Sequence, residues 1–160
     1  MLQQTFVLNF SAPYIPAHFN RELAEIIPFC NIVICNQAEA VSWATSNGLE
    51  AQTNLSTIAK SIAALPSCLP SHSRLVIVTH GAKATICVDS KDPDNPKIHP
   101  VPRLRDEDIV DTNAAGDAFA GGFLAAYLCG KSVNECIEVG HRLAGMCISQ
   151  VWVAIALYPV

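Results

Sequence analysis

Two aspartates, Asp111 and Asp117, bracket a run of very small residues, and an apolar segment follows them. A helix that begins near Ala115 would leave its first backbone N–H groups without intrahelical partners, at the positive end of the helix dipole. Such an N-terminus binds anions, and small residues let a phosphoryl group approach the backbone. The spacing therefore predicts an anion-binding turn with the carboxylate of Asp117 beside the bound anion.

That carboxylate needs a role, because a negative charge beside a phosphate is repelled unless it accepts a proton or holds a metal ion. Accepting a proton is what a hydroxyl nucleophile requires when it attacks a phosphoryl group. The alternative is a tight strand-to-helix turn in which Asp117 only supplies a favourable first-turn charge. The segment has neither the Gly-Lys-Ser/Thr of a P-loop nor the G-x-G-x-x-G of a dinucleotide-binding turn.

The rest of the sequence must position this turn, and it alternates short apolar runs with segments of helical periodicity. Strands are expected at 5–10, 31–36, 75–79, 84–88 and 97–101, and helices at 19–29, 37–46, 54–65, 116–129 and 132–150. The strands at 75–79 and 84–88 are expected to form a hairpin. Runs that are apolar on both faces predict an α/β fold with a mostly parallel sheet covered by helices.

Composition excludes several classes of protein. The chain of 160 residues is 51% hydrophobic and 15% charged, which is far from the composition of disorder. A net charge of −4 without a basic run argues against a nucleic-acid partner. No apolar stretch is long enough for a membrane span, and the N-terminus lacks a signal-peptide pattern. Seven cysteines without a C-x-x-C pair predict reduced, mostly buried thiols in a cytoplasmic or nucleocytoplasmic protein.

The segment "DTNAAGDAFAGGFL" (111–124) resembles the D-T-x-G-A-G-D signature of the ribokinase-like (PfkB) carbohydrate and nucleoside kinases. With "LNFSAPYI", "CNQAEA", "VTHGAKATI" and "ECIEVGH", the chain from about Phe6 to Ile148 resembles the C-terminal half of the adenosine kinase subfamily. The resemblance implies a three-layer α/β/α, ribokinase-like (Rossmann-like) sheet, of which residues 1–148 are the C-terminal portion. Residues 149–160 are then a divergent apolar tail.

The resemblance also implies an activity: ATP-dependent phosphorylation of adenosine to AMP by the complete family protein. Mg²⁺ is the implied cofactor, ATP the co-substrate and a monomer the implied state. The 160 residues lack the family's substrate-binding half, so the chain by itself is expected to be inactive. Two alternatives remain open. The chain is a non-catalytic truncated isoform or fragment that at most binds nucleotide, or it belongs to another PfkB-type sugar kinase.

The family's catalytic positions fall on the small-residue turn. Asp117 corresponds to the base that takes the proton from the ribose 5′-hydroxyl. The backbone of Ala114, Ala115 and Gly116 corresponds to the anion hole for the transferring γ-phosphoryl group. Ala114 stands where the family has its first glycine, so a β-carbon occupies a position where a positive φ is expected.

Further positions match the nucleotide and metal sites of the family. Asn36 and Glu39 match the N-x-x-E motif that organises Mg²⁺ and phosphate, through water. The alternative for this pair is a helix cap, because Asn at the N-cap with Glu three residues later is a capping box. Four residues fall where the family binds ATP: Thr79, Gly81, Asn113 and His141.

Overall fold

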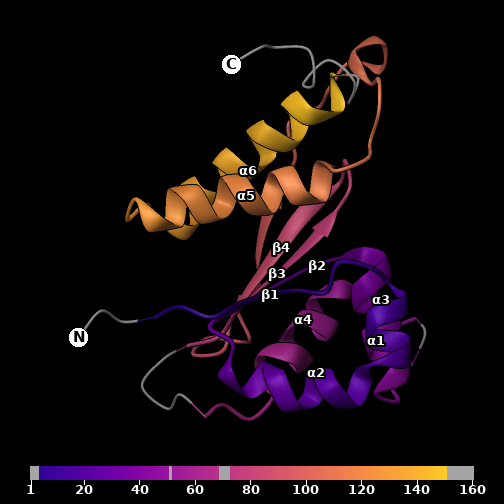
Figure 1. The fold of residues 1–160 in the computed structure, drawn as a ribbon, viewed down its shortest axis with the longest axis vertical. Helices are drawn as coiled ribbons and strands as arrows, with labels where there is room; N and C mark the ends of the chain where they lie inside the picture. The colour runs from indigo at the N-terminus through magenta and orange to yellow at the C-terminus, as the bar shows by residue number, and fades with distance from the viewer. Residues whose placement is uncertain (1–3, 51, 69–72, 151–160) are drawn as a thin grey trace, which may run out of the picture. The chain divides into compact units, whose positions relative to one another are not determined.

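The computed structural model describes residues 4–50, 52–68 and 73–150. The chain forms two compact units, residues 1–100 and residues 101–160 (Figure 1), and each unit is described by itself.

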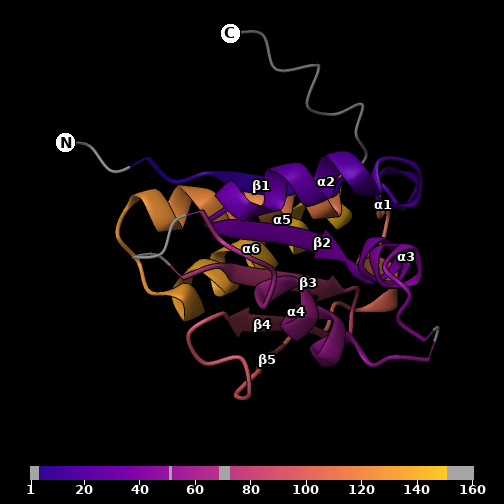
Figure 2. The same ribbon diagram turned by 90° about the horizontal axis from the view of Figure 1, so that it is seen from below.

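The first unit is built on a five-stranded sheet. Its strands are β1 (Val7–Asn9), β2 (Ile32–Asn36), β3 (Leu75–His80), β4 (Ala84–Asp89) and β5 (Lys97–Pro100), in the order β1-β2-β3-β4-β5 (Figure 2). β1, β2 and β3 are mutually parallel, whereas β4 and β5 pair in antiparallel fashion. The α/β fold class is confirmed, and so is the hairpin of β3 and β4; the sheet is mixed, with two parallel and two antiparallel pairings, where a mostly parallel one was expected. The turn after β3 is too short for a crossover, so the next strand has to return antiparallel.

Helices of the first unit are α1 (Tyr14–His18), α2 (Asn20–Ile26), the 3₁₀ turn η1 (Ile27–Phe29), α3 (Gln37–Ser46) and α4 (Leu55–Ala63). α1 was not expected, since the prolines around Tyr14 had indicated a break. Pro16 is tolerated there because it lies in the first turn, where a backbone N–H would have no intrahelical partner. The strands and the other helices lie where the sequence predicted them, with ends shifted by a few residues.

The core of this unit lies between one face of the sheet and α3 and α4. Every second residue of β2 and β3 contributes to it, together with apolar residues of both helices: Val33, Cys35, Val76, Val78, Trp43, Ala44, Ile58 and Ile62. The residues that alternate with these on the strands, Ile32, Ile34 and Ile77, are buried as well. Both faces of the central strands are therefore excluded from water, as their continuous apolar runs predicted.

A buried arginine, Arg74, joins the end of α4 to η1 by hydrogen bonds. The sequence predicted no role for it. Arg74 is 2% exposed and directly precedes β3. Its Nη1 donates hydrogen bonds to the carbonyl oxygens of Leu65 (2.7 Å) and Ile62 (3.2 Å), where α4 ends. Its Nη2 donates to the carbonyl oxygens of Ile27 (2.9 Å) and Pro66 (2.8 Å). The guanidinium thus donates to carbonyl oxygens at helix ends, of which those of Ile62 and Ile27 also accept from a backbone N–H.

The second unit contains the 3₁₀ turn η2 (Asp106–Asp108) and two paired helices, α5 (Ala115–Leu128) and α6 (Val133–Ile148). The helices approach closely because glycine occupies the contact. A β-carbon on Gly140 would lie 2.8 Å from the ring of Phe119, and one on Gly122 would lie 2.9 Å from Leu143. The small residues after Asp117 therefore serve helix packing, in addition to any role that the turn before them has.

The cysteines only partly follow the expectation of buried thiols. Cys30, Cys35, Cys87 and Cys136 are buried, but Cys68 and Cys129 are exposed, and all seven are free thiols. Burial raises the pKa of Cys30 to about 11, although the nearby Arg74 works in the opposite direction. At neutral pH this thiol is therefore protonated and behaves as a small apolar side chain.

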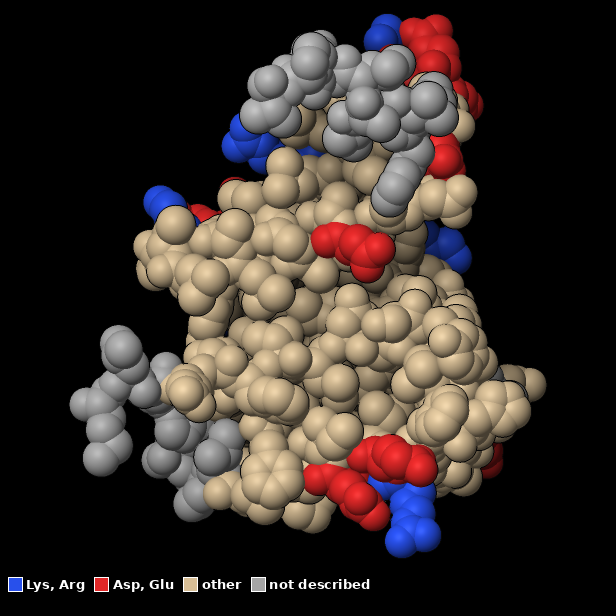
Figure 3. Space-filling model, viewed as in Figure 1, with Lys and Arg blue, Asp and Glu red and all other residues tan. Residues whose placement is uncertain are grey.

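The described surface is unevenly charged. In the view of Figure 3, acidic and basic side chains gather over α2, whose exposed charged residues are Arg21, Glu22 and Glu25. Large apolar side chains are also exposed in this part of the chain, such as Tyr14 (59%) and Phe29 (53%). Within the described ranges, no helix has the length and hydropathy required to cross a membrane.

Candidate functional site

The small-residue turn forms a helix N-terminus without a side-chain cap. α5 begins at Ala115, as predicted, and its N-cap is Ala114. Ala114 has φ 58° and ψ 3°, so it lies in the left-handed region. The positive φ expected at this position is confirmed, and an alanine occupies it although L-residues with a β-carbon avoid this region.

The first backbone N–H groups of α5 are thus presented to an incoming group. Ala115 N donates only a long hydrogen bond (3.4 Å) to the carbonyl of Thr112, and alanine at the N-cap has no side-chain acceptor. Gly116 and Asp117 are both exposed. Two consecutive N–H groups, the helix dipole and an accessible carboxylate therefore lie within a single turn.

Hydrogen bonds from neighbouring segments hold this turn in place. Asp111 Oδ1 accepts a hydrogen bond from Asn113 N (2.9 Å), and Cys147 Sγ lies 3.6 Å from the carbonyl oxygen of Asn113. The carbonyl of Ile148 at the end of α6 accepts hydrogen bonds from Val110 N (3.0 Å) and Asp111 N. Sequence reasoning gave Asp111 no role. The signal was present, because an aspartate that accepts from the backbone N–H two residues on is a common turn pattern.

At the end of β2, Asn36 and Glu39 form a complete capping box. Asn36 Oδ1 accepts a hydrogen bond from Glu39 N (2.9 Å), while Glu39 Oε2 accepts from Asn36 N (2.9 Å). Asn36 Nδ2 also donates to Glu39 Oε1 (2.7 Å). The cap that the sequence left open as an alternative is confirmed, and the metal role of the pair stays a prediction.

The pair offers the oxygen chemistry that Mg²⁺ prefers, but only indirectly. Both carboxylate oxygens of Glu39 already accept hydrogen bonds from Asn36, and Glu39 is only 3% exposed. Direct coordination would break the cap, whereas hydrogen bonds from metal-bound water use the remaining lone pairs. Among the described residues, no group of three or more His, Cys, Asp and Glu is placed to hold a metal ion. The donor set fits Mg²⁺ bound through water.

Thr79 and Gly81 lie close to this capping box in the sheet. Asn36 and Thr79 are register partners at the carboxyl ends of the parallel strands β2 and β3. Gly81 has φ 53° in the turn between β3 and β4, where Lys83 N donates to the carbonyl of His80 (3.0 Å). The turn thus explains this glycine without a ligand, and a nucleotide-binding role for the two residues stays a prediction.

His141 lies in the contact between α5 and α6 and is 8% exposed. The centres of its ring and that of Phe119 are 5.6 Å apart. It is therefore a packed side chain, and its proposed contact with ATP stays a prediction. The structure places Asn36, Glu39 and Thr79 together in the first unit, and Asn113, Ala114, Ala115, Gly116 and Asp117 together in the second.

Comparisons with known proteins point to one group. Residues 2–157 match the family model described as pfkB family carbohydrate kinase, so the match extends into the tail that was expected to diverge. Over 146 residues the chain is 46% identical to an adenosine kinase of Schizophyllum commune, covering 91% of this chain and 42% of that protein. An adenosine kinase of Saccharomyces cerevisiae is 40% identical, covering 91% and 41%.

Solved structures agree with the sequence relatives. The chain matches the crystal structure of Anopheles gambiae adenosine kinase in complex with P1,P4-di(adenosine-5) tetraphosphate with a TM-score of 0.88 and 35% identity. That match covers 98% of this chain and 46% of the other. Adenosine kinase from Schistosoma mansoni in complex with 2-fluoroadenosine matches with a TM-score of 0.87 and 34% identity, covering 92% and 43%. The chain thus spans about two fifths of the length of the curated relatives it matches.

Proposed function

The chain belongs to the pfkB family of carbohydrate kinases, and we propose that the protein of which it is a part phosphorylates adenosine to AMP at the expense of ATP. The substrate follows from the relatives, because proteins named adenosine kinase match nine tenths of the chain. The reaction class follows from the site. The observation that carries it is the open N-terminus of α5, with Asp117 in its first turn.

Asp117 acts as the base in this proposal. Its carboxylate accepts the proton of the ribose 5′-hydroxyl while the hydroxyl oxygen attacks the γ-phosphorus of ATP. The new bond joins the 5′-oxygen to phosphorus, the bond to the β,γ-bridging oxygen breaks, and ADP leaves. The exposure of Asp117 suits this role, since a base must reach the proton that it removes.

The backbone N–H groups of Ala114, Ala115 and Gly116 stabilise the negative charge on the transferring group. This stabilisation depends on donors that are fixed before the reaction starts. The hydrogen bonds from Asn113 N to Asp111 Oδ1 and from Val110 N to the carbonyl of Ile148 supply that rigidity. Ala114 is the N-cap, and its left-handed conformation sets the direction in which the first turn of α5 points.

We assign Mg·ATP binding to the carboxyl ends of β2 and β3, where Asn36, Glu39, Thr79 and Gly81 lie. Ligands of parallel sheets bind outside the carboxyl ends of the strands. Mg²⁺ neutralises phosphate charge when it is bound. Glu39 would orient its water ligands, and the cap that fixes Glu39 also fixes this orientation. Asn113 and His141 are the remaining proposed nucleotide contacts.

The test is the conversion of adenosine to AMP by the full-length protein that contains this segment, with Mg²⁺ and ATP. Ribose and fructose are assayed in parallel, because turnover of a free sugar in preference to adenosine would make the protein a sugar kinase. Asp117→Asn should abolish most of the activity. The matched control is Asp108→Asn, which removes a partly exposed carboxylate paired with Arg105 in the same unit and should leave turnover unchanged.

Residues 1–160 alone are expected to form no AMP. The segment matches only about two fifths of each curated relative, and the remaining length contains the rest of those enzymes. AMP formation by purified residues 1–160 would contradict this expectation and would favour a site complete within this segment.

A further inference from the structure

The last two residues of α6 hold the chain that leads into the small-residue turn. The carbonyl oxygen of Ile148 accepts hydrogen bonds from Val110 N (3.0 Å) and Asp111 N (3.1 Å). The Sγ atom of Cys147, which is partly buried, lies 3.6 Å from the carbonyl oxygen of Asn113, a distance at which a thiol donates a weak hydrogen bond. The end of α6 therefore contacts this segment at three points.

The contact at Asn113 affects the N–H group of Ala114, because the two groups belong to one peptide unit. In a planar trans peptide, the C=O and N–H bonds point in opposite directions. A contact that holds the Asn113 oxygen toward α6 therefore directs the Ala114 N–H away from α6. Among the described residues, no hydrogen bond uses Ala114 N, so this donor is available to an anion.

The conformation of Ala114 gives this contact its importance. Its φ of 58° lies in the region that residues with a β-carbon avoid. Rotation of the peptide unit between Asn113 and Ala114 would return φ to negative values, and the same rotation would turn the Ala114 N–H out of the anion-binding turn. The hydrogen bond from Asn113 N to Asp111 Oδ1 fixes the preceding peptide unit and does not oppose this rotation. The thiol of Cys147 does oppose it, because the rotation would carry the Asn113 oxygen away from Sγ.

We propose that Cys147 is a positioning residue of the phosphoryl-transfer site. Its thiol donates a hydrogen bond to the Asn113 carbonyl and thereby keeps the Ala114 N–H directed at the bound phosphoryl group. This inference rests on the proposed function, which supplies the phosphoryl group. The thiol touches no substrate and takes no part in bond making. An oriented donor acts mainly on the charge that develops in the transition state, so the contribution of Cys147 belongs to kcat more than to KM.

Nuclear magnetic resonance (NMR) tests the contact itself, whatever the activity of the protein. Asn113–Ala114 is the only Asn-Ala pair in the 160 residues, so full-length protein labelled with ¹³C-carbonyl asparagine and ¹⁵N-alanine gives one correlated signal from this segment. Asn113→Gln removes that signal and so identifies it. Cys147→Val and Cys147→Ala both remove the thiol donor, and each should shift the carbonyl carbon and the amide nitrogen of this signal. The second variant decides the question if the first does not fold.

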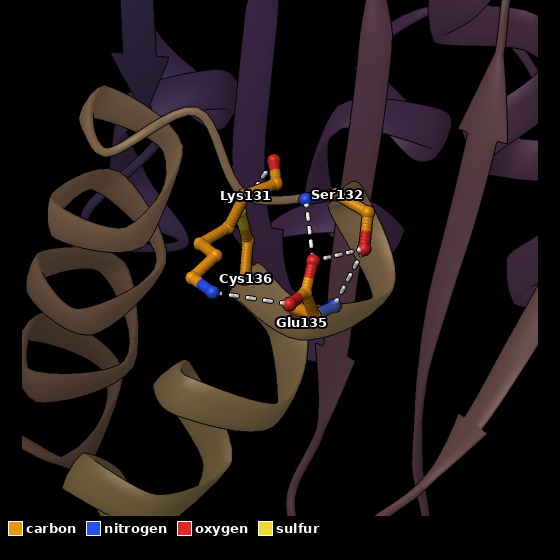
Figure 4. Close-up of polar contacts among 4 residues, drawn as sticks. All are labelled: Lys131, Ser132, Glu135 and Cys136. Carbon is orange, nitrogen blue, oxygen red and sulfur yellow. Dashed lines mark hydrogen bonds and ion pairs between the residues drawn. The ribbon is translucent and has the colours of Figure 1, made fainter.

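Cys136 provides the matched control, because its thiol makes the same kind of contact at the other end of α6. Its Sγ atom lies 3.6 Å from the carbonyl oxygen of Lys131 (Figure 4). Cys136→Val removes this thiol donor as Cys147→Val removes the other. It should leave the Asn113–Ala114 signal in place.

Steady-state kinetics of adenosine phosphorylation then test the effect on the reaction. Cys147→Val should lower kcat roughly 3- to 10-fold, the equivalent of one net hydrogen bond, with KM for ATP and adenosine unchanged. Cys136→Val should leave kcat unchanged.

Three results would overturn the proposal. The first is an Asn113–Ala114 signal that neither Cys147 variant shifts. The second is a kcat of Cys147→Val equal to that of the wild type, or a loss that lies in KM instead. The third is an equal loss of kcat in Cys136→Val, which would mean that α6 acts through its general stability. Absence of AMP formation by the wild type would instead refute the proposed function, and the NMR comparison would still decide whether Cys147 holds the peptide unit.

Discussion

The two helices of the second unit begin in opposite ways. At the start of α6, Glu135 Oε2 accepts hydrogen bonds from Ser132 N (2.9 Å) and Ser132 Oγ (2.7 Å), and Lys131 Nζ lies 3.3 Å from Glu135 Oε1 (Figure 4). Glu135 N in turn donates to Ser132 Oγ (3.4 Å), which completes a capping box. At the start of α5, the N-cap is Ala114 in the left-handed region, with no capping side chain.

The difference shows where the chain gives up local stability. A serine or asparagine at the N-cap is worth about 1 kcal/mol relative to alanine, and an L-residue in the left-handed region loses about 1–2 kcal/mol. Both terms are unfavourable at Ala114. α3, α4 and α6 each have a side-chain cap, at Asn36, Asn54 and Ser132. Departures of this kind from local rules concentrate at functional sites, and α5 begins at the proposed one.

The largest expected effect separates the two first-turn acids. In the full-length protein, Asp117→Ala should lower kcat by roughly 10²–10⁴, the usual loss when a general base is removed. The equivalent change in α6, Glu135→Ala, should leave kcat unchanged and lower only the stability. Steady-state kinetics of both variants check this. Near-normal turnover of Asp117→Ala, or an equal loss in both variants, would remove the functional distinction between the helices.

The next effect concerns stability alone. Ser132→Ala removes the acceptor for Glu135 N and should lower the free energy of unfolding by about 1 kcal/mol. Urea denaturation measures this change as a shift of the midpoint at constant slope. Because the cap has no proposed contact with substrate, KM and kcat should stay the same. A loss of kcat would show that the start of α6 also supports the turnover of the enzyme.

At the start of α5, substitution of the N-cap residue should raise the free energy of unfolding instead of lowering it. Ala114→Gly relieves the strain of φ 58° but increases the entropy of the unfolded chain, which offsets about 0.5–1 kcal/mol. We expect a net gain in stability of at most about 1 kcal/mol. kcat should rise more than KM changes, since the turn acts mainly in the transition state. Unchanged stability and kcat would show that the turn accommodates the alanine without strain.

The elements of the fold follow closely from the sequence, because apolar runs and helical periodicity are local patterns. The capping box of Asn36 and Glu39 could be predicted for the same reason, and so could the start of α5. Two features were not predictable in this way. The short helix at Tyr14 depends on proline in a first turn, and Arg74 acquires its role only when α4, η1 and β3 converge on it.

For the candidate site, the sequence predicted which residues form it better than it predicted the contacts that hold them in place. The run of small residues gave the turn and Asp117, and the position of Ala114 suggested a positive φ. The hydrogen bond between Asp111 and Asn113 could have been found from spacing. The contact of Cys147 with the carbonyl of Asn113 joins residues far apart in the chain, so no local pattern indicates it.

The smallest expected effect is the pH dependence of the α6 cap. Hydrogen bonds from the side chain and backbone of Ser132, and then the charge of Lys131, lower the pKa of Glu135 below its usual 4.5. A lowered pKa in the folded state means that the cap contributes its full stability above the unfolded pKa. That contribution is lost as the pH falls through the folded pKa.

Glu135→Gln isolates this contribution, because glutamine can keep the geometry of the box but carries no charge. Between about pH 7 and about pH 3, the wild type should lose more stability than the variant, with the difference developing below 4.5. Urea midpoints at each pH measure it. About 1 M salt should weaken only the part due to Lys131, since screening acts on exposed charges more than on short hydrogen bonds. Parallel pH profiles for the two proteins would mean that the cap of α6 is held by geometry alone. The difference in stability between the starts of α6 and α5 would then come from their N-cap residues, Ser132 and Ala114, and the first-turn acids Glu135 and Asp117 would add nothing to it.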